Sequence, residues 1–346
     1  MKKLLTIAIL LSCIGMQAQN IIIHDPVMAR ENGKYYLFAT GRGVQILEST
    51  DMQNWTNAGS VFNKAPEWAV KSVPGYRGHT WAPDIQRVGD KWWLFYSCSS
   101  FGKNTSAIGL AVNKTLDKSS ADYEWIDKGV VVRSEKGRTD WNAIDPNMIV
   151  DKKDKKWLCW GSFWDGIQLA KLKNAETEAF DKEKIKGKPI TIARRHPSKN
   201  DIDAADLELA DEAPDAGPNA IEAPFIVYNN GYYYLFASWD YCCKGPRSTY
   251  KTVVGRSRDI KGPYLDRNGR DMAKGGGDII LAADSSYYGI GHCGVYDFDG
   301  KWYIVAHGYD RADFGASKLF LRQLFFDEDG WVRVGTEPIN ATKHQH

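Results

Sequence analysis

The chain has 346 residues, with 45 Lys and Arg against 43 Asp and Glu and a formal net charge of +2 at pH 7. A balance this close to neutral excludes the strongly basic surface that is typical of nucleic-acid or anionic-membrane binding. Hydrophobic residues make up 43% of the chain and aromatic residues 12%, so a large core is available. We therefore expect a soluble globular protein with no nucleic-acid partner.

The first residues have the pattern of a bacterial export signal. Met1-Lys2-Lys3 is a positively charged start, and residues 4–14 form an apolar run too short to span a bilayer. We expect a signal peptide over residues 1–18, cleaved after Ala18, and a periplasmic or secreted product; lipid attachment at Cys13 is the alternative. No later stretch is apolar enough to be a transmembrane segment. Residues 19–346 are expected to form one domain.

The rest of the chain repeats one pattern five times, at intervals of 57 to 78 residues. In four copies a proline follows an Asp or an Ala, and about ten residues later comes a strand rich in aromatic residues. Proline cannot donate to a β ladder, so it marks the entry of a strand. The five entries are His24-Asp25-Pro26, Trp81-Ala82-Pro83, Ile144-Asp145-Pro146, Glu222-Ala223-Pro224 and His292-Cys293-Gly294, of which the last has lost the proline.

The unit around Glu222 shows the pattern most clearly. Residues 225–228 and 232–237 read as two strands, and Asn229-Asn230-Gly231 between them is the signature of a tight hairpin. Third and fourth strands follow in every unit, and repeated four-stranded units are propeller blades. The predicted fold is therefore all-β, a five-bladed β-propeller with its active site on the central axis. A β-sandwich is the alternative, but it has no need of matching acid–proline entries.

The repeat also predicts which side chains meet. The first strand of each propeller blade lines the central channel, so Asp25, Asp145, Glu222 and His292 should surround one pocket. Hydrolysis of a glycosidic bond needs one protonated carboxylic acid and one carboxylate on opposite sides of that bond. A third acid can tune the donor, because a nearby negative charge favours retention of a proton. A single Asp-Pro is more often a turn residue that caps its own backbone, but three acids at blade entries favour catalysis.

These motifs resemble glycoside hydrolase family 43, and within it the endo-acting 1,5-α-L-arabinanases. The likeness covers essentially the whole mature chain. Beyond the blade entries, it is carried by Ser106-Ala107-Ile108-Gly109-Leu110-Ala111, Asn142-Ala143-Ile144-Asp145-Pro146-Asn147, Gly161-Ser162-Phe163-Trp164, Cys242-Cys243-Lys244-Gly245 and Ser248-Thr249-Tyr250.

The resemblance implies a role for each acid in an inverting hydrolysis of plant arabinan or arabino-oligosaccharides. Asp25 would be the general base, Glu222 the general acid, and Asp145 the residue that orients Glu222 and modulates its proton affinity. Further substrate contacts are expected at Trp81, Asn142, Ser162, Phe163, Trp164 and His24; core packing is the alternative for the three aromatic residues among them.

The resemblance also implies a metal ion on the axis, facing His292. One imidazole without a second His or Cys partner is a poor zinc site, so a hydrated calcium ion is the expected cofactor. Cys293 beside it departs from the family, where a polar residue is more usual. A channel histidine bonded only to water and backbone is the alternative.

Several alternatives stay open at this stage. An exo-acting arabinanase or an α-L-arabinofuranosidase would keep the three acids, an invertase-type enzyme would need a nucleophile motif that is absent, and a non-catalytic arabinan-binding propeller would normally have lost one acid. Cys242 and Cys243 are either a vicinal disulfide or free thiols, and Cys98 and Cys159 are expected to be buried thiols. Residues 182–218 are read as a solvated insertion, and a monomer is expected.

Overall fold

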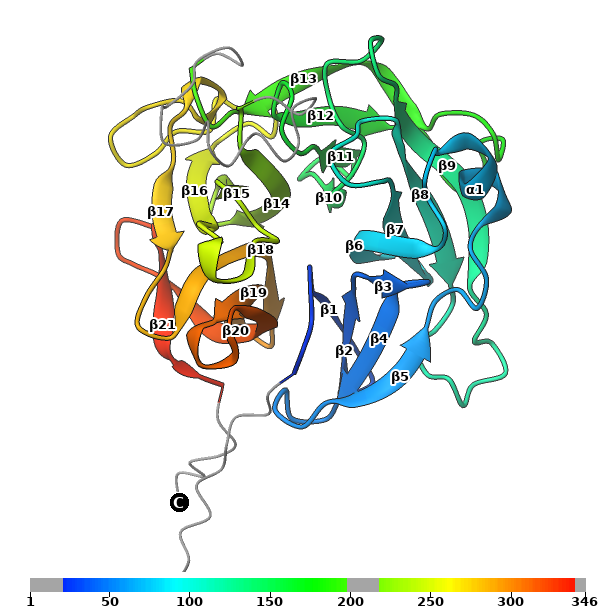
Figure 1. Cartoon of the computed structure of the whole chain (residues 1–346), viewed down its shortest axis with the longest axis horizontal. Helices are drawn as coiled ribbons and strands as arrows, with labels where there is room; N and C mark the ends of the chain where they lie inside the picture. Colours follow the sequence, from blue (N-terminus) through cyan, green and yellow to red (C-terminus); the bar gives the residue numbers. More distant parts are fainter. Residues whose placement is uncertain (1–20, 198–217, 340–346) are drawn as a thin grey trace, which may run out of the picture.

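A computed structural model describes residues 21–197 and 218–339 of the chain. The expected signal peptide and the Cys13 alternative lie outside these residues. Five antiparallel sheets stand around a common axis, which confirms the predicted five-bladed β-propeller (Figure 1). No helix in the described ranges is both long and apolar enough to cross a membrane.

Each sheet is one blade, and its first strand lies nearest the axis (Figure 1). The blades contain, in order, β1 (Val27–Glu31), β2 (Lys34–Ala39), β4 (Gln45–Ser49) and β5 (Thr56–Ser60); β6 (His79–Val88), β7 (Lys91–Cys98), β8 (Ser106–Asn113) and β9 (Ile126–Ser134), with the short β3 (Gly41–Arg42) on the edge of β6; β10 (Asn147–Val150), β11 (Lys156–Trp160), β12 (Ile167–Leu172) and β13 (Ile185–Ala193); β14 (Ile221–Asn229), β15 (Tyr232–Trp239), β16 (Lys251–Ser257) and β17 (Asp278–Leu281); and β18 (Tyr287–Phe298), β19 (Lys301–Asp310), β20 (Ala316–Phe326) and β21 (Val332–Pro338).

Short helices occur only between strands in the described part of the chain. They are α1 (Glu67–Ser72) and the 3₁₀ turns η1 (Gly245–Arg247), η2 (Met272–Lys274) and η3 (Arg311–Asp313). The sequence pattern did not predict α1. It covers six residues and begins after Pro66, with Glu67 in its first turn and Lys71 in its last, as the helix dipole favours.

The local turn chemistry follows the sequence. Asn229 pairs with Tyr232 across the predicted hairpin, and the two residues between them, Asn230 and Gly231, have φ angles of 45° and 88°. Positive φ at both positions matches the right-handed twist of the strands, and Asn and Gly adopt it at low cost.

The ring closes by pairing its two ends. The Ile23 N–H donates to the Ser317 carbonyl at 3.2 Å, and the Leu319 N–H donates to the Ile21 carbonyl at 3.0 Å, so residues 21–23 extend along the start of β20. Behind this seam Leu37 of the first blade and Val305 of the last share one fully buried apolar cluster. Burial of a side chain of this size contributes about 1.5–3 kcal/mol, so the seam is stabilised by packing as well as by hydrogen bonds.

Two details of the predicted organisation are wrong. The solvated insertion predicted for residues 182–218 begins too early, because Lys184 is fully buried and donates to the Val130 carbonyl at 2.6 Å. Residues from Ile185 to Ala193 then form β13, the outer strand of the third blade, as a nine-residue segment with only its end buried. The remainder of the predicted insertion, residues 198–217, lies outside the described residues.

The alignment of the fifth blade is also wrong, by one residue. Each innermost strand carries one residue with positive φ at its entry: Asp25 (52°), Ala82 (41°), Asp145 (56°), Ala223 (55°) and His292 (53°). His292 therefore corresponds to Asp25 and Asp145, whereas Glu222 stands one position earlier in its blade. The missing proline hid this shift, because the sequence alignment had no other fixed point in the fifth copy.

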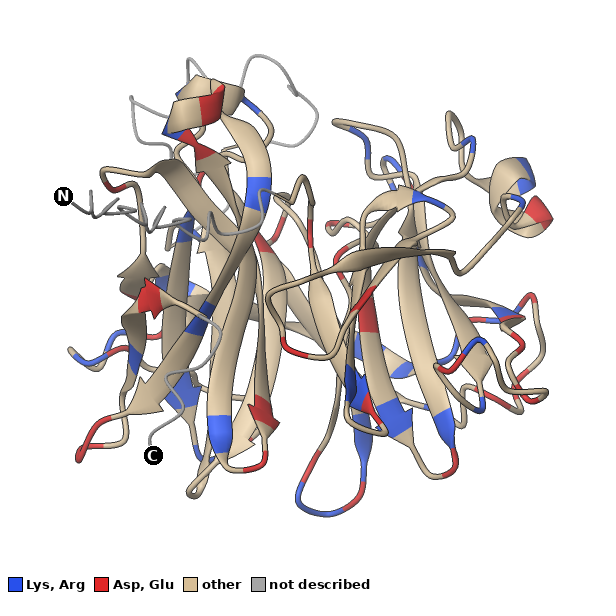
Figure 2. Cartoon of the chain, turned by 90° about the horizontal axis from the view of Figure 1, so that it is seen from below, with Lys and Arg blue, Asp and Glu red and all other residues tan. Residues whose placement is uncertain are grey.

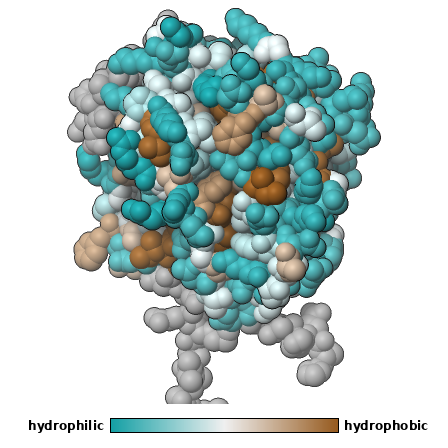
Figure 3. All heavy atoms as spheres, turned by 90° about the vertical axis from the view of Figure 1, so that its right-hand side faces the viewer, coloured by the Kyte–Doolittle hydropathy of each residue, from teal (hydrophilic) through white to brown (hydrophobic). Residues whose placement is uncertain are grey.

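The outer surface carries both signs of charge. Lys, Arg, Asp and Glu are interspersed over strand ends and loops (Figure 2). The face in Figure 3 is mostly hydrophilic, with separate hydrophobic groups among the polar ones. Figure 2 shows no side of one charge sign, in agreement with the near-neutral composition.

Candidate active site

A fixed hydrogen bond holds the backbone of each blade entry. At or near the end of the second strand of the preceding blade, one side chain accepts from the positive-φ N–H: His307 Nδ1 from Asp25 (3.1 Å), Thr40 Oγ1 from Ala82 (2.8 Å), Ser97 Oγ from Asp145 (3.0 Å) and Ser238 Oγ from His292 (2.8 Å). The equivalent residue before the fourth blade is Gly161, which has no side chain. There the Asp145 carboxylate takes its place and accepts the Ala223 N–H at 3.1 Å.

The hydrogen bond from the Ala223 N–H to the Asp145 carboxylate connects Asp145 to Glu222. The accepting carboxylate holds the peptide that directly follows Glu222, so it fixes the direction in which the Glu222 side chain leaves the strand. The orienting role that the resemblance implies for Asp145 thus has a concrete route through one backbone N–H.

One pocket of about 550 Å³ opens at the mouths of the innermost strands. All ten residues proposed from the sequence line it: His24, Asp25, Trp81, Asn142, Asp145, Ser162, Phe163, Trp164, Glu222 and His292. They come from all five blades, as the repeat predicted. The structure brings them together, while the role of each stays a prediction.

Asp25 is held by imidazoles. Its Oδ1 lies 2.8 Å from His24 Nδ1 and 2.9 Å from His292 Nδ1, and its Oδ2 accepts from Thr40 Oγ1 at 2.5 Å. Burial by itself would raise the pKa of Asp25, but the two histidines outweigh it and hold that pKa well below its usual value. Burial likewise opposes a charge on His292, yet Asp25 and the other two acids raise its pKa to about 9. At neutral pH, Asp25 is therefore an ionised carboxylate paired with a cationic His292.

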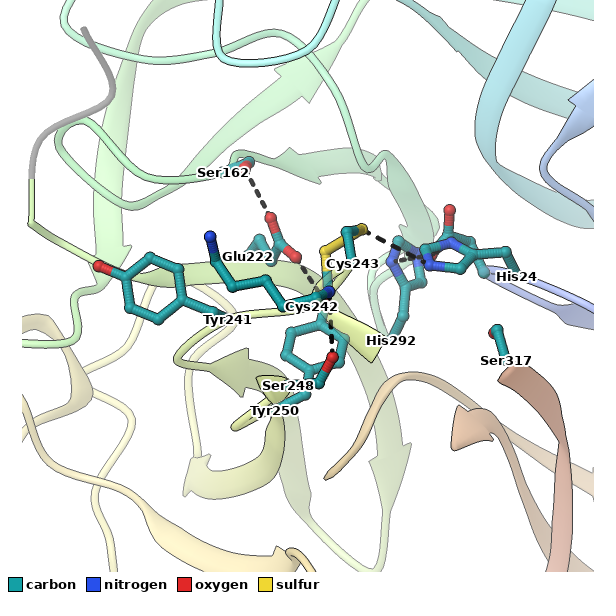
Figure 4. The surroundings of a disulfide bond; sticks show 12 residues. His24, Ser162, Glu222, Tyr241, Cys242, Cys243, Ser248, Tyr250, His292 and Ser317 are labelled. Atoms are coloured by element: carbon teal, nitrogen blue, oxygen red, sulfur yellow. Dashed lines mark hydrogen bonds and ion pairs between the residues drawn. A yellow bond between two sulfur atoms is a disulfide. The ribbon is translucent and has the colours of Figure 1, made fainter. Parts of the chain in front are cut away.

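Glu222 is held by neutral hydroxyls. Its Oε2 accepts from Ser162 Oγ at 2.8 Å, and its Oε1 accepts from the Tyr250 hydroxyl at 2.7 Å (Figure 4). Burial, followed by the negative charge of Glu222, raises the pKa of Tyr250 well above its ordinary value, so the phenol keeps its proton. Burial also raises the pKa of Asp145, and Glu222 and Asp25 add to this effect against the opposing charge of His292. The pKa of Asp145 is therefore shifted upward, whereas that of Asp25 is shifted downward.

The substrate contacts expected from the sequence differ in exposure. Trp81, Phe163 and Trp164 are half-buried at the pocket, so none of the three is enclosed in the core. Phe163 and Trp164 directly follow Gly161 and Ser162 in the chain. Their φ angles of 55° and 41° put both residues in a left-handed turn. Asn142 is buried, and within the described residues its Oδ1 has no hydrogen-bond partner, which suits a sugar hydroxyl.

Sequence reasoning missed several groups at the site. Thr40, His307 and Tyr250 contact the acids directly, and Tyr309 contacts His24 and His307. A signal for two of them was present: Thr40 and His307 follow the first aromatic residue of the second strand of their blades by five positions, as Ser97 does. Cys242 and Cys243 also line the pocket and are bonded as a vicinal disulfide, while Cys98 and Cys159 are buried thiols as predicted.

The protein groups around His292 do not form a ready calcium cage. In the described ranges, the His, Cys, Asp and Glu side chains with ligand atoms within 4.8 Å of one another are His24, Asp25 and His307. His292 is outside this group, and its Nδ1 is paired with Asp25. Calcium takes six to eight oxygens, so an ion here would depend on water for most of its ligands.

An ionised carboxylate and two further carboxyl groups in one pocket at the mouth of a propeller fit a glycosidase-type site. Comparison with known proteins assigns the family: the profile of glycosyl hydrolases family 43 matches residues 19–332. The chain belongs to this family and is a glycoside hydrolase.

Three relatives illustrate the similarity. The chain is 42% identical over 335 residues, 97% of its own length and 92% of the relative's, to the extracellular exo-α-(1→5)-L-arabinofuranosidase ArbA of Cellvibrio japonicus. It is 40% identical over 320 residues, 91% and 88% of the two chains, to the extracellular endo-α-(1→5)-L-arabinanase 1 of Bacillus subtilis. An exo-1,5-α-L-arabinanase from a bovine ruminal metagenomic library has a solved structure with 56% identity and a TM-score of 0.83, which covers 92% of this chain and 98% of that one.

Proposed function

We propose that this protein hydrolyses α-1,5-L-arabinofuranosyl linkages of arabinan with inversion of the anomeric centre. The observation that carries the proposal is the contrast between the surroundings of its two principal acids. Asp25 is kept ionised by two imidazoles, and Glu222 stands beside neutral hydroxyls and the proton-holding Asp145. The substrate class is taken from the names of the three relatives.

In this mechanism Asp25 accepts a proton from a water molecule as that water attacks the anomeric carbon. Glu222 gives its proton to the glycosidic oxygen on the other side, and the leaving sugar departs as an alcohol. Ser162 and Tyr250 hold the two Glu222 oxygens in place, and Asp145 fixes the peptide that follows it. The half-buried rings of Trp81, Phe163 and Trp164 supply apolar faces for the arabinofuranosyl rings.

The experiment follows hydrolysis of debranched arabinan by proton NMR at early times. Inversion gives the β-anomer first, followed by slow mutarotation, whereas the α-anomer as the first product would contradict the mechanism. No reducing ends from arabinan would contradict the activity and favour a binding protein.

The mode of cleavage has two candidates. Arabinanase-type motifs around Asp145 and Phe163 favour internal cleavage, which gives a ladder of oligosaccharides and a fast fall in viscosity. Two of the three relatives are named exo-acting, and this favours release from a chain end. Arabinose or one fixed short oligomer from the first minutes would establish the exo mode.

Export and a bound cation complete the proposal. Two relatives are named extracellular, in agreement with a signal peptide at residues 1–18. A mostly hydrated cation such as calcium near His292 is proposed without any catalytic step assigned to it. Metal analysis of the purified protein and thermal unfolding with and without a chelator test the ion; absence of metal together with unchanged unfolding would refute it.

A further inference from the structure

Tyr309 is the last residue but one of β19, and its hydroxyl has three nitrogen partners as well as the more distant Cys243 Sγ at 3.9 Å. It lies 2.7 Å from the Cys243 N–H, 3.1 Å from His24 Nε2 and 3.1 Å from His307 Nε2. The side chain is buried, and its residue is 3% exposed. Neither Tyr309 nor its partners include an acid of the proposed reaction, but the imidazoles of His24 and His307 both contact Asp25.

Counting donors and acceptors fixes every proton in this set. His307 Nδ1 accepts the Asp25 N–H, so the ring proton of neutral His307 is on Nε2 and is donated to the Tyr309 oxygen. The Cys243 N–H occupies the second acceptor position of that oxygen. The phenol proton therefore goes to His24 Nε2 at 3.1 Å rather than to the more distant Cys243 Sγ at 3.9 Å, so that Nε2 is an acceptor and the His24 ring proton is on Nδ1, where it faces Asp25 Oδ1 at 2.8 Å.

The other blades show what is unusual about His307. Thr40, Ser97 and Ser238 stand at the equivalent position, and a hydroxyl there suffices to hold the next blade's N–H. A hydroxyl at position 307 could do the same for Asp25, but it could not reach Tyr309. The imidazole adds a second nitrogen for that contact, and its ring stacks on His24 with centroids 3.9 Å apart.

The vicinal disulfide fixes the third partner. Cys243 has a φ of 64°, in a turn closed by the Thr249 N–H to the Tyr241 carbonyl at 3.0 Å and by the Lys244 N–H to Ser248 Oγ at 3.1 Å. The Cys243 sulfur also lies 3.7 Å from His24 Nε2 (Figure 4). The Tyr309 hydroxyl thus accepts a hydrogen bond from the fourth blade. It also contacts one imidazole of the fifth blade and one of the first blade.

We propose that Tyr309 is a positioning residue for the general base: through one hydroxyl it fixes the two imidazoles that hold the carboxylate and the backbone N–H of Asp25. This inference rests on the proposed function, because it assumes that Asp25 activates the attacking water. Loss of the hydroxyl frees His24 to rotate or change tautomer. Asp25 then loses a hydrogen-bond donor, and its carboxylate is no longer oriented toward the attacking water. Substrate binding by the aromatic rings is left unchanged.

The test compares Tyr309→Phe with Tyr303→Phe, the same exchange at the far end of the same strand. With a nitrophenyl arabino-oligosaccharide, Tyr309→Phe should lower kcat about tenfold, the value of one hydrogen bond to a charged site, while KM stays within about twofold. Tyr303→Phe should behave as wild type. A better leaving group should relieve the loss in Glu222→Gln, where proton donation is impaired, but not the loss in Tyr309→Phe.

A second variant separates positioning from structure. His307→Ser restores the hydroxyl used by the other blades, so it can keep the Asp25 N–H bond while it loses Tyr309. It should show the same kcat loss with unchanged KM, and it replaces Tyr309→Phe if that protein fails to fold. Kinetics equal to Tyr303→Phe, or a loss confined to KM, would overturn the inference. Full activity in Asp25→Asn would instead refute the proposed function.

Discussion

The two sides of the pocket treat a buried carboxyl group in opposite ways. On the seam between the last and first blades, Asp25 meets two imidazoles and is held ionised. On the side of the third and fourth blades, Asp145 and Glu222 meet hydroxyls and a backbone N–H, and burial raises the pKa of Asp145 well above its usual value. Burial acts on both sides alike, so the charge of the partner decides the protonation state.

Asp84 gives an independent example of the second kind. It is fully buried on β6 and accepts from neutral donors: the Met148 N–H at 2.7 Å, Asn147 Nδ2 at 3.2 Å and the Ile85 N–H. Burial raises its pKa to about 7 despite these bonds. Neutral hydrogen bonds therefore do not offset the desolvation of Asp84, whereas the imidazoles around Asp25 do offset that of Asp25.

The largest effect on turnover should come from replacing either Asp25 or Glu222. Asp25→Asn and Glu222→Gln should each lower turnover on arabinan by about a hundredfold or more, the lower range of general acid–base catalysis. Reducing-end assays on folded protein measure it. Near-wild-type activity in either variant would show that the two carboxyl groups do not divide the roles in this way.

Replacement of the Asp145 carboxyl group by an amide should have a smaller effect on turnover. Asp145→Asn can still accept the Ala223 N–H, so the peptide after Glu222 stays in place while the neighbouring carboxyl group is lost. We expect turnover to fall about tenfold, the loss of roughly one charged interaction. The alkaline limb of the pH–rate profile should move to lower pH, because no neighbouring carboxylate then resists ionisation of the acid. An unmoved limb would assign Asp145 a purely structural role.

The smallest effect concerns stability and Asp84. Its pKa is about 7 in the folded protein and 3.8 in the unfolded chain, so the unfolded state ionises first as the pH rises. Wild-type stability should therefore fall relative to Asp84→Asn between pH 3.8 and 7, by at most about 1.4 kcal/mol per pH unit, and level off above pH 7. Denaturant unfolding at several pH values measures the difference. A difference that is constant with pH would show that Asp84 is ionised when folded.

Much of the fold could be predicted from local sequence. Asn229-Asn230-Gly231 encodes its hairpin because only certain residues tolerate two positive φ angles in succession. The aromatic strands and proline entries recur because every blade must place one strand at the axis and bury both of its faces. The structure has a third and a fourth strand in all five blades, as the repeat predicted.

The sequence by itself determined the five blades, the three acids and their meeting in one pocket, because those follow from repeat period and strand alternation. It did not determine the partners of the acids. Gly161 leaves a gap that the Asp145 carboxylate fills, and His307 reaches both Asp25 and Tyr309, 282 residues and two residues away along the chain. Those contacts depend on the ring closing and on a one-residue shift in the fifth blade. Protonation of a buried acid is set by neighbours within a few ångströms, and only the tertiary structure decides which neighbours those are.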